Sequence, residues 1–188
     1  TRLDGVSELM STPVPISLKS LSDYEQHIGE AGINEILRLA EPLRGCSVLH
    51  FNATSFGGGV AEILSSLVPL LLDLGIEAEW QVMDAPSDFF DVTKTMHNGM
   101  QGMRIPWTKS MVNQWVETNR AHADSITGKY DFVYVHDPQP AGVLHYLQQR
   151  DRQRLGAKWI WRCHLDTTDA VPVVWDFLQG FVASYDAM

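Results

Sequence analysis

The sequence predicts an α/β protein built on a doubly wound, Rossmann-like parallel sheet. Strand-like stretches alternate with stretches of helical periodicity along most of the 188 residues. The strand-like stretches are continuous apolar runs, which is typical of a parallel sheet that helices cover on both faces. The glycine-rich and histidine-rich segments come directly after such runs, where ligands bind in sheets of this kind.

Composition and charge restrict the classes of partner. Hydrophobic residues make up 45% of the chain and the formal charge is −9, so we expect a protein with a real core and neither nucleic acid nor an anionic membrane as its main partner. No apolar run approaches the roughly 18 residues of a membrane span, and no signal peptide is recognised, so we expect a soluble, cytoplasmic protein. Cys46 and Cys163 lack the spacing of a zinc site and are expected to be free thiols.

The elements before the first central strand are short. Residues 1–16 contain Pro13 and Pro15 and are predicted to form an extended arm, and residues 17–188 form the domain. Helical spacing predicts two short helices, near 20–28 and 32–41.

The central elements follow from apolar runs and helical spacing. Residues 46–51 (CSVLHF) are mainly apolar and are predicted to be a buried strand. Residues 60–75 place apolar side chains at helical spacing and end at Gly75, a natural C-terminal cap, with a kink predicted at Pro69. By the same criteria we expect strands at 77–83, 131–135 and 157–163, helices at 88–101, 109–123, 140–150 and 171–180, and the start of another strand within 181–188.

Three consecutive glycines separate the first central strand from its helix. Gly57, Gly58 and Gly59 allow a tight turn and close approach of a ligand to the backbone, and the free N–H groups of the following helix favour an anion such as phosphate. The P-loop pattern is absent. The dinucleotide pattern GxGxxG fits until its third position, which is Glu62 and disfavours a nicotinamide or flavin cofactor. A plain tight turn without a ligand stays open.

Histidine and aspartate follow two further strands. His136 and Asp137 come after the strand at 131–135, and Pro138 predicts an extended turn there. His164 and Asp166 come after the strand at 157–163. In a parallel sheet all these residues would share one rim with the glycines, and such groups suit the hydroxyls of a sugar. Structural hydrogen bonds and a metal site are the alternatives.

One predicted helix adds weaker candidates. Lys94, His97 and Gln101 would lie on one face of the helix at 88–101, where Lys94 could neutralise a phosphate. A solvated polar face is the alternative. The GxSxG pattern of a serine nucleophile is absent, and the spacing leaves a hydrolase with paired carboxylates open.

Four motifs in this order, NATSFGGGVAEIL, VTKTMHN, VHDPQPAG and WRCHLD, resemble the N-terminal half of the trehalose glycosyltransferring synthases of glycosyltransferase family 4. The resemblance runs from about Ser17 to the C-terminus. It implies one half of a two-domain GT-B architecture and a retaining transfer of glucose from a nucleotide-diphosphate glucose to glucose, which forms trehalose. It also implies that the C-terminal nucleotide-sugar domain is absent from this chain, so the fragment alone should be inactive.

The resemblance also implies roles for individual residues. No cofactor is expected beyond the donor substrate, a need for Mg²⁺ stays open, and the partners would be the two sugars and the missing C-terminal domain, with a homodimer left open. The catalytic candidates, which would lie beside the acceptor and the reacting sugar, are His136, Asp137, His164 and Asp166. The candidates beside the donor phosphates are Gly57, Gly58, Gly59, Lys94 and His97.

Two other functions stay open at this stage. A sucrose-phosphate-synthase-like enzyme would need a cationic pocket for a phosphorylated acceptor, which Arg104 and Lys109 could supply. A non-catalytic module that binds a sugar or a nucleotide would need the fold but no reacting groups.

Overall fold

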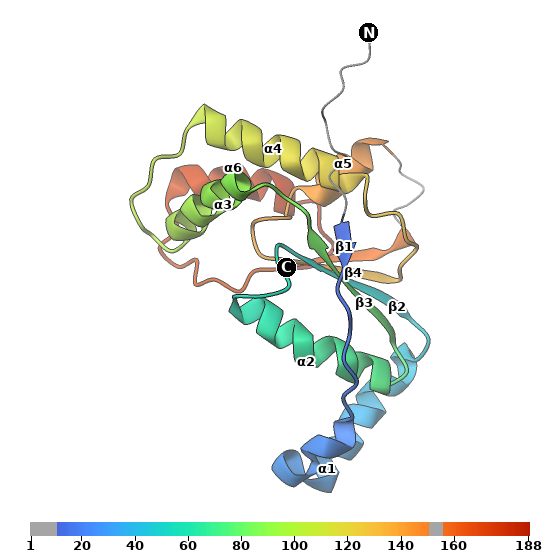
Figure 1. The fold of residues 1–188 in the computed structure, drawn as a ribbon. Helices are drawn as coiled ribbons and strands as arrows, with labels where there is room; N and C mark the ends of the chain where they lie inside the picture. Colours follow the sequence, from blue (N-terminus) through green and yellow to red (C-terminus); the bar gives the residue numbers. More distant parts are fainter. Residues whose placement is uncertain (1–10, 151–155) are drawn as a thin grey trace.

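The computed structural model describes residues 11–150 and 156–188 and contains a five-stranded sheet (Figure 1). The strand order is β1-β3-β2-β4-β5, with β1 antiparallel to β3 and the other neighbours parallel. The predicted α/β class is confirmed. The strands are β1 (Ser11–Pro13), β2 (Ser47–Asn52), β3 (Glu77–Met83), β4 (Phe132–His136) and β5 (Lys158–Arg162).

The helices lie on both faces of this sheet. In Figure 1, α3 to α6 lie on one side and α2 on the other, which is the doubly wound arrangement predicted from the sequence. None of the helices in the described part of the chain is long and apolar enough to cross a membrane. The helices are α1 (Glu25–Ala40), α2 (Gly59–Asp73), α3 (Ser87–Met100), α4 (Lys109–Ala123), α5 (Val143–Arg150) and α6 (Pro172–Val182), with 3-10 turns at Leu21–Tyr24 and Glu41–Leu43.

Several boundaries differ from the predicted ones for identifiable reasons. The two short N-terminal helices are merged into α1, whose backbone is non-helical at Gly29. Residues 11–13 of the predicted arm pair with β3 as a short edge strand, and residues 1–10 lie outside the described part. The helix α2 is continuous through Pro69. The last predicted strand is represented only by Ala187, which pairs in parallel with Ile160, because α6 extends to Val182.

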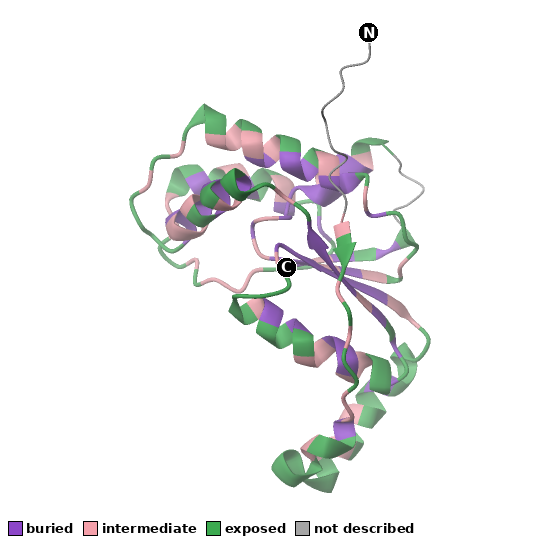
Figure 2. Ribbon diagram, viewed as in Figure 1, coloured by how far each residue is buried: buried purple, intermediate pink, exposed green. Residues whose placement is uncertain are grey.

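The sheet lies between helices that carry buried residues on both of its sides (Figure 2), and the alternation of side chains along each strand divides the core into two apolar layers. On one face, Leu49 and Phe51 of β2 and Val133 of β4 pack with the helices α3 to α6. On the other face, Trp80 and Val82 of β3 pack against α2. Consequently the intervening residues of β2 and β4, such as His50 and His136, point toward the α2 side of the sheet.

A close contact between α4 and the loop after β4 offers a test of this packing. A Cβ added at Gly142 would lie 2.7 Å from Trp115 Cη2 and 3.0 Å from Asn119 Cβ, whereas one added at the exposed Gly180 of α6 would meet nothing within 4 Å. We expect Gly142→Ala to lower the free energy of unfolding by about 1–3 kcal/mol through overpacking. The matched change Gly180→Ala should raise it by about 0.5–1 kcal/mol, because alanine is favoured over glycine within a helix. Urea denaturation of both variants checks this, and equal effects would contradict the packing described.

Candidate functional site

The glycine turn connects the end of β2 to the start of α2. Gly57 has φ +73°, a left-handed conformation that favours glycine, while Gly58 is extended and forms the N-cap of α2 without a side-chain cap. A Cβ added at Gly57, Gly58 or Gly59 would meet nothing within 4 Å. Of these three glycines, Gly57 is the one whose backbone conformation favours glycine. At the other two positions the missing side chains leave open space beside the first N–H groups of the helix.

Hydrogen bonds of Asn52 and Thr54 fix the backbone at the beginning of this turn. The Asn52 Oδ1 accepts a hydrogen bond from Trp80 Nε1 at 2.7 Å, and its Nδ2 donates to the Thr54 carbonyl at 2.7 Å. The Thr54 Oγ1 accepts from the Phe56 N–H at 3.3 Å. The direction in which the chain leaves β2 is therefore set by side chains of the turn and of β3, and the glycines after it remain exposed.

The corner after β4 has an unusual backbone. Asp137 has φ +65°, the one non-glycine residue with positive φ in the described part of the chain. The extended turn predicted from Pro138 is therefore wrong at Asp137. The left-handed conformation, which aspartate tolerates better than most residues, is held by three hydrogen bonds: the Asp137 N–H donates to the Arg162 carbonyl at 2.9 Å, the Asp137 carbonyl accepts from Trp161 Nε1 at 2.9 Å, and Asp137 Oδ1 accepts from the His164 N–H at 2.7 Å.

The next residues of this loop are fixed from α4. The Trp115 Nε1 donates to the Pro138 carbonyl at 3.1 Å, and Asn119 Nδ2 donates to the Gln139 carbonyl at 2.9 Å. Asn119 also accepts from the Gly142 N–H at 3.0 Å. Both α4 side chains are buried, so the loop rests on a rigid support.

The glycine turn and the Asp137 corner open into one cavity of about 250 Å³. Its volume is slightly below the usual range of about 300–1,000 Å³ for ligand pockets, which suits a small polar ligand. Side chains from three separate parts of the sequence meet there. The wall contains Asn52, Ala53, Thr54, the glycine turn with Val60 and Ala61, His97, His136, Asp137 and Gln139.

Gln139 is a wall residue that the sequence analysis did not single out. Its Oε1 is buried and has no hydrogen-bond partner among the described residues. A buried acceptor without a partner is destabilising, so Gln139 is a wall residue whose hydrogen bonding is incomplete within the described part of the chain. Its position within the VHDPQPAG motif is the only sequence signal that could have pointed to it.

Not every predicted site residue reaches this cavity. His97 lines it, but Lys94 on the same predicted helix face is exposed and is not part of the wall. Asp166 is also exposed, and its Oδ1 accepts from the Thr168 N–H and hydroxyl at 3.0 and 2.7 Å. His164 is not part of the wall either, and its Nε2 is 3.0 Å from His136 Nδ1. The roles predicted for these residues stay predictions.

Burial controls the charge of the central groups. It lowers the pKa of His136 to about 3 and that of His50 to about 4, with Arg162 acting in the same direction in both cases. Burial also raises the pKa of Asp137, while the His164 N–H and the nearby His164 and His97 rings oppose this shift. At neutral pH the two buried imidazoles are therefore uncharged.

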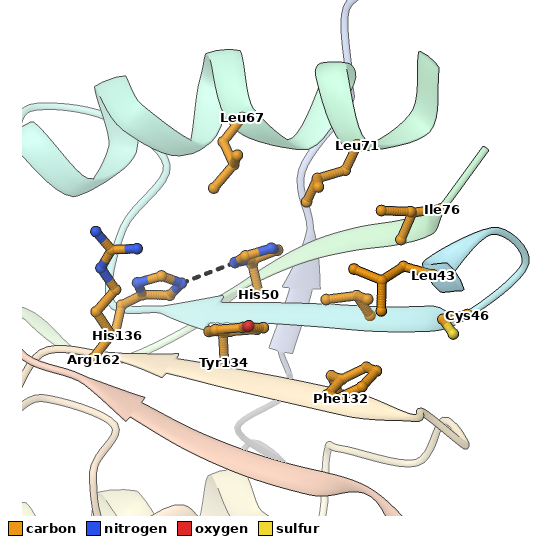
Figure 3. Close-up of a pocket in the computed structure, with 11 residues that line it drawn as sticks. Leu43, Cys46, His50, Leu67, Leu71, Ile76, Phe132, Tyr134, His136 and Arg162 are labelled. Carbon is orange, nitrogen blue, oxygen red and sulfur yellow. Dashed lines mark hydrogen bonds between the residues drawn. The ribbon is translucent and has the colours of Figure 1, made fainter. Parts of the chain in front are cut away.

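A second cavity lies on the other side of His136, between α2 and the sheet (Figure 3). Leu67 and Leu71 of α2 point toward His50 and Tyr134 across it. Its lining is mainly apolar, so it does not suit a sugar or a phosphate. His136 belongs to the walls of both cavities.

Comparison with known proteins adds the family to this geometry. The family described as "Trehalose synthase, N-terminal domain" matches residues 50–188. The chain belongs to this family. A trehalose synthase from Pyrococcus horikoshii is 44% identical over 170 residues, which cover 89% of this chain and 40% of that protein. The corresponding enzyme from Rubrobacter xylanophilus is 45% identical over 172 residues, 90% of this chain and 41% of that protein.

Less similar relatives are named trehalose phosphorylases. A trehalose phosphorylase from Pleurotus sajor-caju is 28% identical over 172 residues, 84% of this chain and 22% of that protein. The chain spans about 40% of the length of the trehalose synthases it matches. The family predicted from the four motifs is confirmed.

The lowered pKa values of the buried imidazoles predict how stability depends on pH. The unfolded chain takes up protons near pH 6.5, whereas His50 and His136 in the folded protein do so only near about 4 and about 3. Between these values the unfolded state binds more protons, so the free energy of unfolding should fall as the pH drops, by up to about 1.4 kcal/mol per pH unit for each imidazole.

Urea denaturation between pH 7 and pH 4.5 measures this slope. His50→Phe should reduce this slope by up to about 1.4 kcal/mol per pH unit, because one of the two imidazoles that take up a proton on unfolding is gone. His27→Phe, at an exposed position of α1, should leave it unchanged. An unaltered slope in His50→Phe would show that His50 takes up its proton at the same pH in the folded and the unfolded protein, and would contradict the lowered pKa.

Proposed function

We propose that the chain is the N-terminal, acceptor-side domain of a retaining glucosyltransferase that transfers glucose from a nucleotide-diphosphate glucose to glucose and forms trehalose. The observation that carries this proposal is the shared cavity: in a member of the trehalose synthase family, the bare amides of the glycine turn and the polar groups of the Asp137 corner face the same space. The retaining course and the nucleotide donor rest on the resemblance to glycosyltransferase family 4.

The glycine turn is suited to the donor phosphates. The first N–H groups of α2 have no intrahelical acceptors, and the helix dipole makes this end positive. A leaving nucleotide diphosphate gains negative charge in the transition state, which preorganised N–H groups stabilise. Gly58 and Gly59 allow the phosphates to approach the backbone closely. These amides supply positive potential without a metal ion, so we propose no metal cofactor.

The opposite wall is suited to the acceptor sugar. His97, Asp137 and Gln139 offer hydrogen-bonding groups of different kinds within one small cavity. Glucose carries several hydroxyls that each donate and accept, so a wall of this composition can fix its orientation. Holding the acceptor hydroxyl in line with the donor carbon accounts for much of the rate enhancement in such a transfer.

The remainder of the enzyme would complete the site. Since the relatives are more than twice as long, we propose that a second domain binds the nucleotide and closes over this cavity. The 188 residues alone should then bind the acceptor without catalysing the transfer. The two half-buried free cysteines agree with a cytoplasmic enzyme.

A second candidate function is supported by the phosphorylase relatives. In that case the full-length protein would cleave trehalose with inorganic phosphate, and phosphate would occupy the amides of the glycine turn. Supplying the full-length protein with either nucleotide-diphosphate glucose plus glucose or trehalose plus phosphate separates the two. Trehalose formation in the first mixture supports the transferase, and glucose phosphate in the second alone would overturn it.

Isothermal calorimetry on the 188-residue chain tests the acceptor site. We expect glucose to bind and nucleotide-diphosphate glucose to bind no more tightly than glucose. Gln139→Met should weaken glucose binding about 3–10-fold, because a hydrogen bond of about 0.5–1.5 kcal/mol is lost. Gln101→Met, at an exposed position outside the cavity, is the matched control. Tight nucleotide binding by this chain would instead support a nucleotide-binding module.

A substitution in the glycine turn separates ligand contact from folding. In the full-length enzyme, Gly58→Val should lower turnover at least tenfold, because the side chain enters the space proposed for the donor phosphates. The free energy of unfolding should fall by no more than about 1 kcal/mol, the preference of an N-cap position for glycine over an aliphatic residue. Gly57→Val should cost about 1–2 kcal/mol more, because its backbone is left-handed. Turnover unaffected by Gly58→Val would indicate a plain turn.

A further inference from the structure

Three imidazoles form a hydrogen-bonded row across the sheet. His50 Nδ1 is 3.0 Å from His136 Nε2, and His136 Nδ1 is 3.0 Å from His164 Nε2. The first of these contacts is drawn in Figure 3. Adjacent rings are also stacked, with centroids 5.3 Å apart in both pairs. The row therefore leads from the apolar cavity at His50, through His136 in the walls of both cavities, to His164 in the segment after β5.

The strand register produces this row. His50 of β2 pairs with Tyr134 of β4, and His136 pairs with Arg162 of β5. Each successive histidine is thus displaced by two residues along the next strand, on the same face of the sheet. Residues in such a diagonal relation are within reach of each other when the side chains are aromatic.

Protons in a neutral row of this kind must be ordered. Because burial lowers the pKa values of His50 and His136 to about 4 and about 3, both rings are uncharged at neutral pH. A neutral imidazole has one N–H and one lone pair. His136 contacts an imidazole through each of its nitrogens, so it must accept from one neighbour and donate to the other. Reversal of one ring requires reversal of the others.

The two ends of the row favour one direction. His50 is 3% exposed, and its Nε2 is buried with no partner among the described residues. An orphaned buried N–H is rarer than an unpaired acceptor, and the cationic Arg162, which lines the same cavity, also favours a lone pair there. At the other end, the carboxyl group of Asp137 acts on His164 and favours an N–H. Donation should therefore run from His50 to His164.

We infer that His50 is a positioning residue. It donates its Nδ1–H to His136 Nε2 and so holds His136 in the Nδ1–H form, and His136 holds His164 in the same form. The row then ends in the Nδ1–H of His164, a half-buried residue of the segment after β5, and this N–H is the group that would donate to a sugar hydroxyl or a diphosphate oxygen of the bound substrates. This inference deepens the proposed function, and the identity of the ligand depends on that function. The order of the protons along the row does not depend on it.

Long-range ¹H–¹⁵N NMR of the ¹⁵N-histidine-labelled chain at pH 7 reads the tautomers directly, without ligand. We expect His50, His136 and His164 each to carry the proton on Nδ1, the minor form of free histidine. His50→Phe should release His136 and His164 into mixtures of tautomers. His50→Asn should preserve the Nδ1–H form of both, because its Nδ2 lies near the place of the His50 Nδ1. His27→Phe, at an exposed position, is the control.

Each outcome decides the inference. Nδ1–H forms that disappear in His50→Phe and return in His50→Asn support it, and loss of stability alone would not produce that pattern. Nε2–H forms in the native chain would overturn the direction, and unchanged tautomers in His50→Phe would overturn the positioning role. If His50→Phe does not fold, the native spectrum and His50→Asn still decide. Failure of glucose to bind would count against the proposed function only.

Discussion

The parallel alignment of β2, β4 and β5 is the constraint on which the site depends. Because these strands run in the same direction, their carboxyl ends lie at one edge of the sheet. The segments that follow the strands are therefore brought together although they are far apart in the sequence. The glycine turn follows β2 and the Asp137 corner follows β4. The same register sets the diagonal spacing of His50, His136 and His164. A shift of one residue in either strand pair would move these side chains to the opposite face.

The site combines an open wall with a strongly supported one. The glycines are exposed and touch little, so their arrangement leaves room for a ligand. The Asp137 corner is held in a left-handed conformation by bonds from β5 and followed by a loop fixed on α4. Strained backbone conformations persist where the surrounding structure over-determines them and often occur at functional sites. Here this conformation places a half-buried carboxyl group of raised pKa in the same cavity as the open amides of the glycine turn.

The two cavities around His136 differ in chemistry, and the imidazole row is what connects them. One is lined by backbone amides and polar side chains, the other by aliphatic and aromatic groups. An apolar surrounding makes a charged imidazole costly, so the row stays neutral and each ring depends on its neighbours for its tautomer. His50, which is buried and lies outside the wall of the candidate cavity, can in this way control the tautomer of His136 and, through it, that of His164.

The sequence by itself determined the order of strands and helices, the glycine turn and the family, because apolar periodicity, glycine runs and the four motifs are local properties of the chain. It also predicted that the Gly57–Gly59 turn and His136 would share one rim, since parallel strands have only one carboxyl edge. Only the tertiary structure decided which candidates line the cavity: His97 does and Lys94 does not, because helix rotation and loop direction depend on packing against the sheet. The proposed role of His50 was likewise not visible in the sequence, and Gln139 was marked only by its place in the VHDPQPAG motif. A missing hydrogen-bond partner and a diagonal contact are properties of the neighbours in space, which the folded sheet alone assembles.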